Sequence, residues 1–289
     1  MKPTRGEKLF YGFTYTLLTL IALTCLLPLI HVGALSFSGA HAITSGDIGM
    51  WPVDFTWDTY REVLKGTRII QSFLNSVVIT GVGVVLSMLA TILAAYPLSR
   101  RSFYARRFFT LAMVFTLLFN GGIIPAFLVV KGFGLMDSYA AIWLPALVST
   151  YNMLVMRTYF ERIPQELLEA AHMDGCNEWR LLGQIVLPLS MPVLATLTLF
   201  YGVSYWNSFM NVLLFMNSTD SYNMAVLVQQ MVQNQQLLGE LRAPGDNVQL
   251  VAEGVKAAAI VLMMLPMLVV YPFVQRFFVR GVMLGAVKG

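Results

Sequence analysis

The sequence predicts an all-α integral membrane protein with six membrane-spanning helices and both termini in the cytoplasm. Three observations predict it: an apolar composition, six long windows without a charged residue, and an unequal distribution of cations between alternate loops. Of the 289 residues, 57% are hydrophobic and only 12% are charged, about half the charged fraction of a soluble domain. The mean hydropathy of +0.68 agrees with a chain that is solvated by a bilayer.

The charge-free windows predict where the helices lie. A spanning helix needs about 20 apolar residues, and a charge at its centre costs about 3 kcal/mol. Asp, Glu, Lys and Arg are absent from residues 9–46, 69–99, 108–130, 138–156, 181–219 and 257–275. We therefore expect one transmembrane domain over residues 1–289, with spans at about 10–35, 72–98, 108–130, 139–160, 186–206 and 256–279.

A seventh uncharged window, residues 221–239, is not predicted to span. It holds seven amide side chains, whose donors would stay unpaired in hydrocarbon. Met224, Leu227, Val228 and Met231 recur at helical spacing. They predict an amphipathic helix on the membrane surface or across the outer mouth of the protein.

The cations predict the orientation. With the N-terminus inside, the cytoplasmic segments hold thirteen Lys and Arg residues and the outer segments hold six, as the positive-inside rule requires. The net charge of +4 thus reflects topology and gives no argument for a nucleic-acid partner. The apolar stretch 9–35 is longer than the core of a signal peptide, so we interpret it as a retained anchor helix.

Little in the sequence indicates enzyme chemistry. Cys25 lies in the first predicted span and Cys176 in a cytoplasmic loop, so they are not predicted to pair. His31, His41 and His172 are scattered, without metal-ligand spacing. The chain has no G-x-x-x-x-G-K-[ST] phosphate loop. We expect no catalytic site, no metal and no cofactor in this chain.

The cytoplasmic loop 161–184 carries the most specific signal. Pro164 suits a first helical position, residues 165–173 predict a short helix, and Gly175 can end it in the left-handed conformation. Asn177 can cap a second short helix. The predicted apolar sides are Leu167, Leu168, Ala171 and Ala170 on the first helix, and Trp179 and Leu182 on the second.

The residues of this loop and the segment after it resemble the EAA signature of permease subunits of bacterial ABC importers. The resemblance implies a type I importer permease (MetI-like) fold, with the loop docking in a cleft of an ATPase subunit. An amphipathic loop on the lipid surface is the alternative, but it gives no reason for this spacing. The coupling residues that the resemblance implies are Glu169, Ala170, Ala171, Asp174, Gly175, Ile185, Leu187 and Pro188.

Two further segments are similar to carbohydrate importers. The C-terminal segments 275–281 and 285–289 are similar to those of maltose-type sugar permeases, and Asn120–Pro125 resembles a branch linked to polysaccharide breakdown products. The implied partners are a second, different permease, two ATPase copies that bind ATP and Mg, an extracytoplasmic sugar-binding protein and membrane lipid. The implied location is the bacterial plasma membrane.

Cargo contacts are predicted from chemistry suited to a neutral polar ligand. Aromatic and amide side chains lie at the outer end of the fifth span, and glycines loosen the third. The alternatives are close helix packing for the glycines and an interfacial aromatic belt, which we favour for Trp206. The substrate-path candidates are Asn120, Gly121, Gly122, Tyr201, Tyr205 and Asn207.

Two other functions stay open. The same loop signature would fit an ABC importer of a non-sugar solute such as a peptide or polyamine. An ion-coupled secondary transporter is less favoured, because the predicted spans contain no acid and only His31 lies near one.

Overall fold

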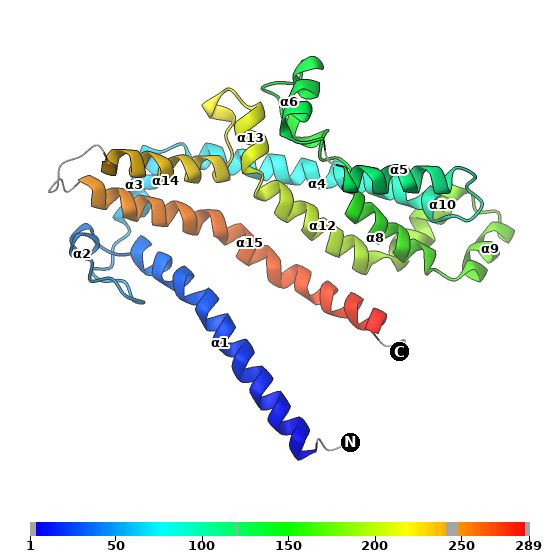
Figure 1. The fold of residues 1–289 in the computed structure, drawn as a ribbon, viewed down its shortest axis with the longest axis horizontal. Coiled ribbons are helices and arrows are strands. Elements are labelled where there is room, and N and C mark those ends of the chain that lie inside the picture. Colours follow the sequence, from blue (N-terminus) through cyan, green and yellow to red (C-terminus); the bar gives the residue numbers. More distant parts are fainter. Residues whose placement is uncertain (1–3, 120, 241–247, 287–289) are drawn as a thin grey trace. The chain divides into compact units, whose positions relative to one another are not determined.

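The structure is a computed structural model that describes residues 4–119, 121–240 and 248–286. The described residues contain helices, turns and loops but no strand, which confirms the all-α fold class (Figure 1). The chain divides into two compact units, residues 1–70 with 227–265 and residues 71–226 with 266–289. Each unit is described by itself, and the single domain predicted over residues 1–289 stays a prediction.

The first unit begins with α1 (Arg5–Ser36), a 32-residue helix. Its start is a capping box, in which Thr4 Oγ1 accepts the Glu7 N–H and the Glu7 carboxylate accepts the Thr4 N–H. Only 6% of its most apolar window is buried, so this helix presents its side chains outward, as an anchor in lipid does. The short helices α2 (Ala40–Ser45) and α3 (Asp58–Gly66) follow.

The helices α14 (Met224–Glu240) and α15 (Val248–Ala286) each have residues in both units. The helix predicted in the amide-rich window is confirmed as α14. Met224 and Val228 are buried and Leu227 and Met231 are half-buried, so the predicted apolar face is the face that packs. Its place at the membrane surface or outer mouth stays a prediction.

The second unit is built on α4 (Ile69–Ser99), which contacts α8 (Thr150–Glu161) and α12 (Met191–Trp206) (Figure 1). Its core includes Ile79, Met153, Met156, Phe160 and Leu197, each at most 1% exposed. The other elements in chain order are α5 (Arg106–Leu118), α6 (Ile123–Gly132), α7 (Ala140–Trp143), α8 (Thr150–Glu161), α9 (Gln165–Met173), α10 (Glu178–Leu181), the π-helix η1 (Leu182–Val186), α11 (Leu187–Leu189), α12 (Met191–Trp206), α13 (Phe209–Phe215) and the 3₁₀ turn η2 (Thr219–Ser221).

Within the described residues, three single helices are long and apolar enough to cross a membrane: Gly6–Ser36, Ile69–Ser99 and Glu253–Pro272. Two bent pairs also qualify, α5 with α6, and Glu178–Leu189 with Met191–Trp206, the latter bent by 83°. That gives up to five spans by length and composition, so the count of six stays a prediction.

The difference in count comes from the predicted span 139–160. There α7 and α8 are separated by residues 144–149, which include Pro145, a residue without a backbone N–H for a helical bond. The predicted span 108–130 is likewise interrupted, and Gly122 precedes α6 with a φ of +85°.

Candidate functional site

Loop 161–184 folds as its local signals predict. Helix α9 covers residues 165–173, with Pro164 one position ahead of it as the N-cap. Gly175 has a φ of +79°, the Cys176 N–H donates to Ala171 O, and the Gly175 N–H donates to His172 O. These are the two bonds of a Schellman motif. Asn177 Oδ1 then accepts the Arg180 N–H at 2.9 Å, capping α10.

The buried side of the loop is narrower than predicted. Leu168 and Ala171 are 9% and 6% exposed and pack into the core, and α10 buries Leu181. Leu167 and Trp179 belong to the predicted apolar sides of the two short helices but are not buried. They are 48% and 72% exposed, because only residues three apart on α9, and the end of α10, meet the rest of the chain.

The loop therefore presents apolar side chains to the exterior. Met173, at the end of α9, is 88% exposed, and Leu167 on α9 and Trp179 on α10 are exposed too. Ala170 is exposed as well. We call Leu167, Met173 and Trp179 the exposed apolar set. Large apolar side chains held at a protein surface mark an interaction site more often than scattered exposure does.

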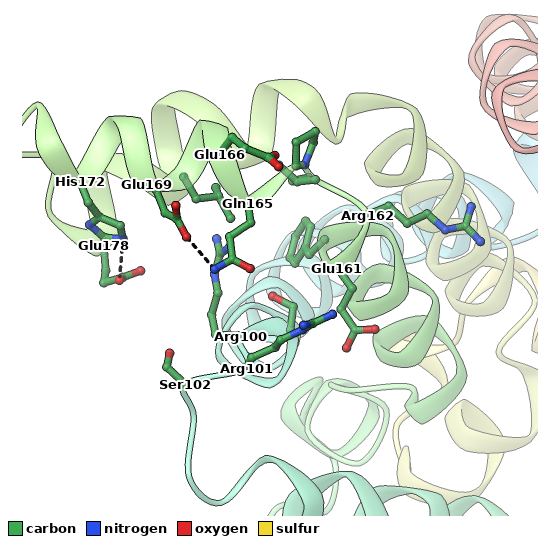
Figure 2. A pocket seen from close by; sticks show the side chains of 15 residues that line it. Arg100, Arg101, Ser102, Glu161, Arg162, Gln165, Glu166, Glu169, His172 and Glu178 are labelled. Carbon is green, nitrogen blue, oxygen red and sulfur yellow. Dashed lines mark hydrogen bonds and ion pairs between the residues drawn. The ribbon is translucent and has the colours of Figure 1, made fainter.

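A polar pocket of about 490 Å³ lies beneath α9 (Figure 2). It is bounded by residues 99–102 at the end of α4, residues 160–163 at the end of α8, residues of α9, and Glu178. Gln165 Nε2 donates to Glu169 Oε1 at 2.8 Å, and His172 Nε2 lies 3.5 Å from Glu178 Oε1 (Figure 2).

The pocket also connects the loop to α4. The Tyr96 hydroxyl donates to Glu178 Oε2, and the Arg100 guanidinium lies over the Tyr96 ring, 4.5 Å from its centroid. Because Glu178 belongs to α10 and Tyr96 to α4, this bond fixes the loop to the C-terminal end of α4.

The remaining signature residues lie where the loop joins α12. Ile185 lies in the π-helix and Leu187 in α11, and both pack against the core. Pro188 is exposed. The π-helix was not predicted, and such wide turns occur often at functional sites.

Two predicted cargo residues, Tyr201 and Tyr205, tie α12 to α4. The Tyr201 hydroxyl lies 2.7 Å from Thr91 Oγ1 and accepts the Ser149 N–H at 2.9 Å. The Tyr205 hydroxyl lies 2.8 Å from Ser87 Oγ. Both tyrosines are 3% exposed. We call these two pairs the tyrosine seam.

A cavity of about 400 Å³ lies beside the tyrosine seam, lined by residues of 145–152 and 200–205. Asn152 lines it, is 6% exposed, and makes no side-chain hydrogen bond within the described residues. The rings of Tyr151 and Phe200, also in the lining, lie 6.5 Å apart. The sequence analysis did not predict Tyr151, Asn152 or Phe200 as cargo residues, although Thr150, Tyr151 and Asn152 form a polar run in an otherwise apolar window.

The other cargo candidates do not line this cavity. Asn207 Nδ2 donates to Val203 O at 3.0 Å and so closes the end of α12. Gly121 and Gly122 precede α6, and Asn120 lies outside the described residues. Trp206, interpreted as a belt residue, is 4% exposed, so it packs inside the chain.

Comparison with known families decides the identity. Residues 83–284 match the family described as "Binding-protein-dependent transport system inner membrane component". The chain belongs to this family. This inner membrane component is accordingly a multi-pass protein of the plasma membrane, as its long apolar helices require.

Relatives extend over the whole chain. The inner membrane component is 40% identical over 290 residues to the polygalacturonan/rhamnogalacturonan transport system permease protein YtcP of Bacillus subtilis (strain 168), covering 100% of both chains. It is 35% identical to Protein LplC of the same organism, covering 100% of this chain and 98% of the other.

A solved structure confirms the permease fold. A chain of a bacterial ABC transporter involved in the import of the acidic polysaccharide alginate matches with a TM-score of 0.86 and 31% identity, covering 96% of this chain and 99% of that chain. The agreement supports the all-helical importer-permease architecture for the inner membrane component.

Proposed function

We propose that this permease imports a carbohydrate by alternating access, driven by ATP hydrolysis on separate subunits that dock at loop 161–184. YtcP is named as a permease of a polygalacturonan/rhamnogalacturonan transport system, and the structural neighbour belongs to a transporter involved in alginate import. The observation that carries the ATPase-docking part of the proposal is the exposed apolar set on a loop whose backbone is fixed by the Schellman motif and the Asn177 cap.

The contacts beneath the loop support its role as a lever. Docking would engage Leu167, Met173 and Trp179, while Leu168 and the bond from Tyr96 to Glu178 keep the loop fixed to the helices. Closure of the ATPase pair would then move α4 and α12 together. The signature residues Glu169, Ala170 and Asp174 lie exposed on the same loop.

The proposed assembly has four kinds of component. A second, different permease would complete the pathway, and two ATPase copies would bind ATP and Mg beneath it. An extracytoplasmic solute-binding protein would deliver the cargo. A bacterial alginate ABC transporter has been crystallised in complex with an alginate pentasaccharide-bound periplasmic protein, which supports that delivery.

The cavity beside the tyrosine seam suits a neutral face of a sugar. Its ten lining residues include aromatic rings, serine hydroxyls and the Asn152 amide, and none of these ten is charged. Aromatic rings can stack on sugar C–H faces, and an amide without a protein partner can bond a ligand hydroxyl. A peptide or polyamine would find no charged partner among these residues, and neither would the carboxylates of an acidic oligosaccharide. The cavity would therefore hold an uncharged face of the cargo.

A docking experiment tests the ATPase coupling. Met173→Glu with Trp179→Glu is expected to reduce binding-protein-stimulated ATP hydrolysis in proteoliposomes, with ATPase affinity falling about thirtyfold or more, as for interface hot spots. Phe133→Glu is the matched control, because Phe133 is 77% exposed outside the loop. Unchanged stimulated hydrolysis in the double variant would rule out docking through these residues.

A separate experiment tests the cargo. Asn152→Leu is expected to lower uptake of labelled oligosaccharide severalfold while the ATPase still co-purifies, since losing a hydrogen bond costs about 1 kcal/mol. Val155→Leu on the same helix, outside the cavity lining, is the control. Equal oligosaccharide uptake by wild type and Asn152→Leu would remove this cavity from the path, and gradient-driven uptake without ATP would favour a secondary transporter.

A further inference from the structure

Four arginines converge on a second pocket at the turn between α4 and α5. The pocket measures about 400 Å³ and includes no acidic residue in its lining. The cation distribution of the sequence predicts that this turn faces the cytoplasm. The lining residues are Arg101, Phe103, Tyr104, Arg106, Arg107, Thr110, Leu111 and Arg157.

The positive charge of this pocket is only partly compensated. Arg106 Nη2 and Arg157 Nε both contact Glu161 Oε1, at 2.5 and 2.9 Å. Arg157 Nη1 also donates to Thr110 Oγ1 at 2.8 Å. Arg101 and Arg107 are exposed and have no side-chain partner among the described residues. Glu161 thus compensates Arg106 and Arg157. Arg101 also lines the pocket beneath α9, whose lining includes four glutamates. The excess of positive charge therefore rests on Arg107 and, in part, on Arg101.

An exposed apolar stripe leads away from the pocket along α5. Phe108, Leu111, Phe115 and Leu118 recur every three or four residues and are between 59% and 71% exposed. The described side chains of α5 include none that is buried. The stripe and the arginines therefore form one surface, cationic at the helix N-terminus and apolar over the following turns.

We propose that this surface is a binding site for an anionic phospholipid of the cytoplasmic leaflet. The arginines would hold the phosphate-bearing headgroup, with bidentate contacts that guanidinium groups make to phosphate. The acyl chains would lie along Phe108, Leu111, Phe115 and Leu118. Free phosphate or a nucleotide would use the charge but not the apolar stripe, whereas a phospholipid uses both. Basic pockets between spanning helices at this depth bind anionic headgroups.

Lipid retention tests the site without reference to cargo or ATP. The full-length protein, with any subunits that co-purify, would be reconstituted in nanodiscs that contain phosphatidylcholine and phosphatidylglycerol. Bound lipid would be counted by native mass spectrometry after release. We expect enrichment of phosphatidylglycerol on the wild type and a fall of about fivefold per arginine, or roughly thirtyfold, in Arg101→Gln with Arg107→Gln.

Two matched variants sharpen the result. Arg162→Gln with Arg180→Gln removes the same charge outside this pocket and is expected to keep the enrichment. Arg101→Lys with Arg107→Lys keeps the charge and is expected to keep most of the phosphatidylglycerol enrichment. Equal retention of both lipids by the wild type would overturn the proposal. An equal loss of phosphatidylglycerol enrichment in the two double Arg→Gln variants would also overturn it. Displacement of the bound lipid by millimolar inorganic phosphate would overturn it as well.

Discussion

Loop 161–184 and the tyrosine seam place their side chains in opposite ways. The loop presents large apolar side chains outward, with Met173 88% exposed. The seam buries hydroxyls, with Tyr201 and Tyr205 3% exposed and bonded to α4. A large apolar side chain that is exposed to water, such as Met173, indicates a surface for a protein partner. Buried hydroxyls between membrane helices, such as those of Tyr201 and Tyr205, hydrogen-bond one helix to another. The contrast separates a surface for another subunit from a joint within this one.

The largest expected effect comes from two neighbouring leucines of α9. Leu168→Ala removes a side chain that packs in the core and should lower the free energy of unfolding by about 2–5 kcal/mol. Leu167→Ala should change it by about 0.5 kcal/mol or less, since Leu167 is half exposed. Unfolding monitored by circular dichroism in detergent compares the two. Equal losses of unfolding free energy in the two variants would mean that α9 does not have one side packed in the core and another exposed for a partner.

The next prediction concerns the close approach of α4 and α12. A Cβ on Gly83 would lie 2.9 Å from atoms of the Tyr205 ring. Gly83→Ala should therefore displace the ring and lower the free energy of unfolding by about 1–3 kcal/mol. Gly81→Ala, where a Cβ meets nothing within 4 Å, is the control on the same helix. A thermal shift that is the same in both variants would contradict the packing of this seam.

Gly175 gives a smaller effect in the loop. Its φ of +79° costs an L-residue about 1–2 kcal/mol, so Gly175→Ala should lower the stability of the protein by that amount. Gly175→Asn should lower it less, because Asn tolerates this conformation better. The measurement is the midpoint of thermal unfolding. If alanine and asparagine proved equally harmless, the loop would not depend on this turn.

The smallest difference is expected within the tyrosine seam. Tyr201→Phe removes contacts to Thr91 and to the Ser149 N–H, whereas Tyr205→Phe removes only the contact to Ser87. Hydrogen bonds between membrane helices contribute about 0.6 kcal/mol each and at most about 1.7. Tyr201→Phe should therefore destabilise the protein more than Tyr205→Phe in a side-by-side unfolding series, and the reverse order would contradict the bonding pattern.

The sequence predicts much of this molecule where the signals are local. The helix 165–173, its Gly175 turn and the Asn177 cap are confirmed, because each depends on a few adjacent residues. The long apolar helices α1 and α4 follow in the same way from charge-free windows.

Features that depend on contacts between distant segments could not be predicted. Which leucine of α9 is buried depends on the core formed by α4 and α8, and the partners of Tyr201 come from residues 91 and 149. Asn152 becomes a candidate cargo residue only from the structure, which shows that it is a buried residue lining a cavity. Pro145 is a local signal for the break at residues 144–149. The charge-free window nevertheless predicted one continuous span over residues 139–160.

A site-directed cross-link tests the central claim of this account most directly. In a chain with Cys25→Ala and Cys176→Ser, a single Met173→Cys would be treated with a short bifunctional reagent in membranes that contain the whole assembly. The account predicts a cross-link to the ATPase subunit and protection of Cys at position 173 from a bulky maleimide. Labelling at the same rate with and without the ATPase, and no cross-linked product, would contradict it.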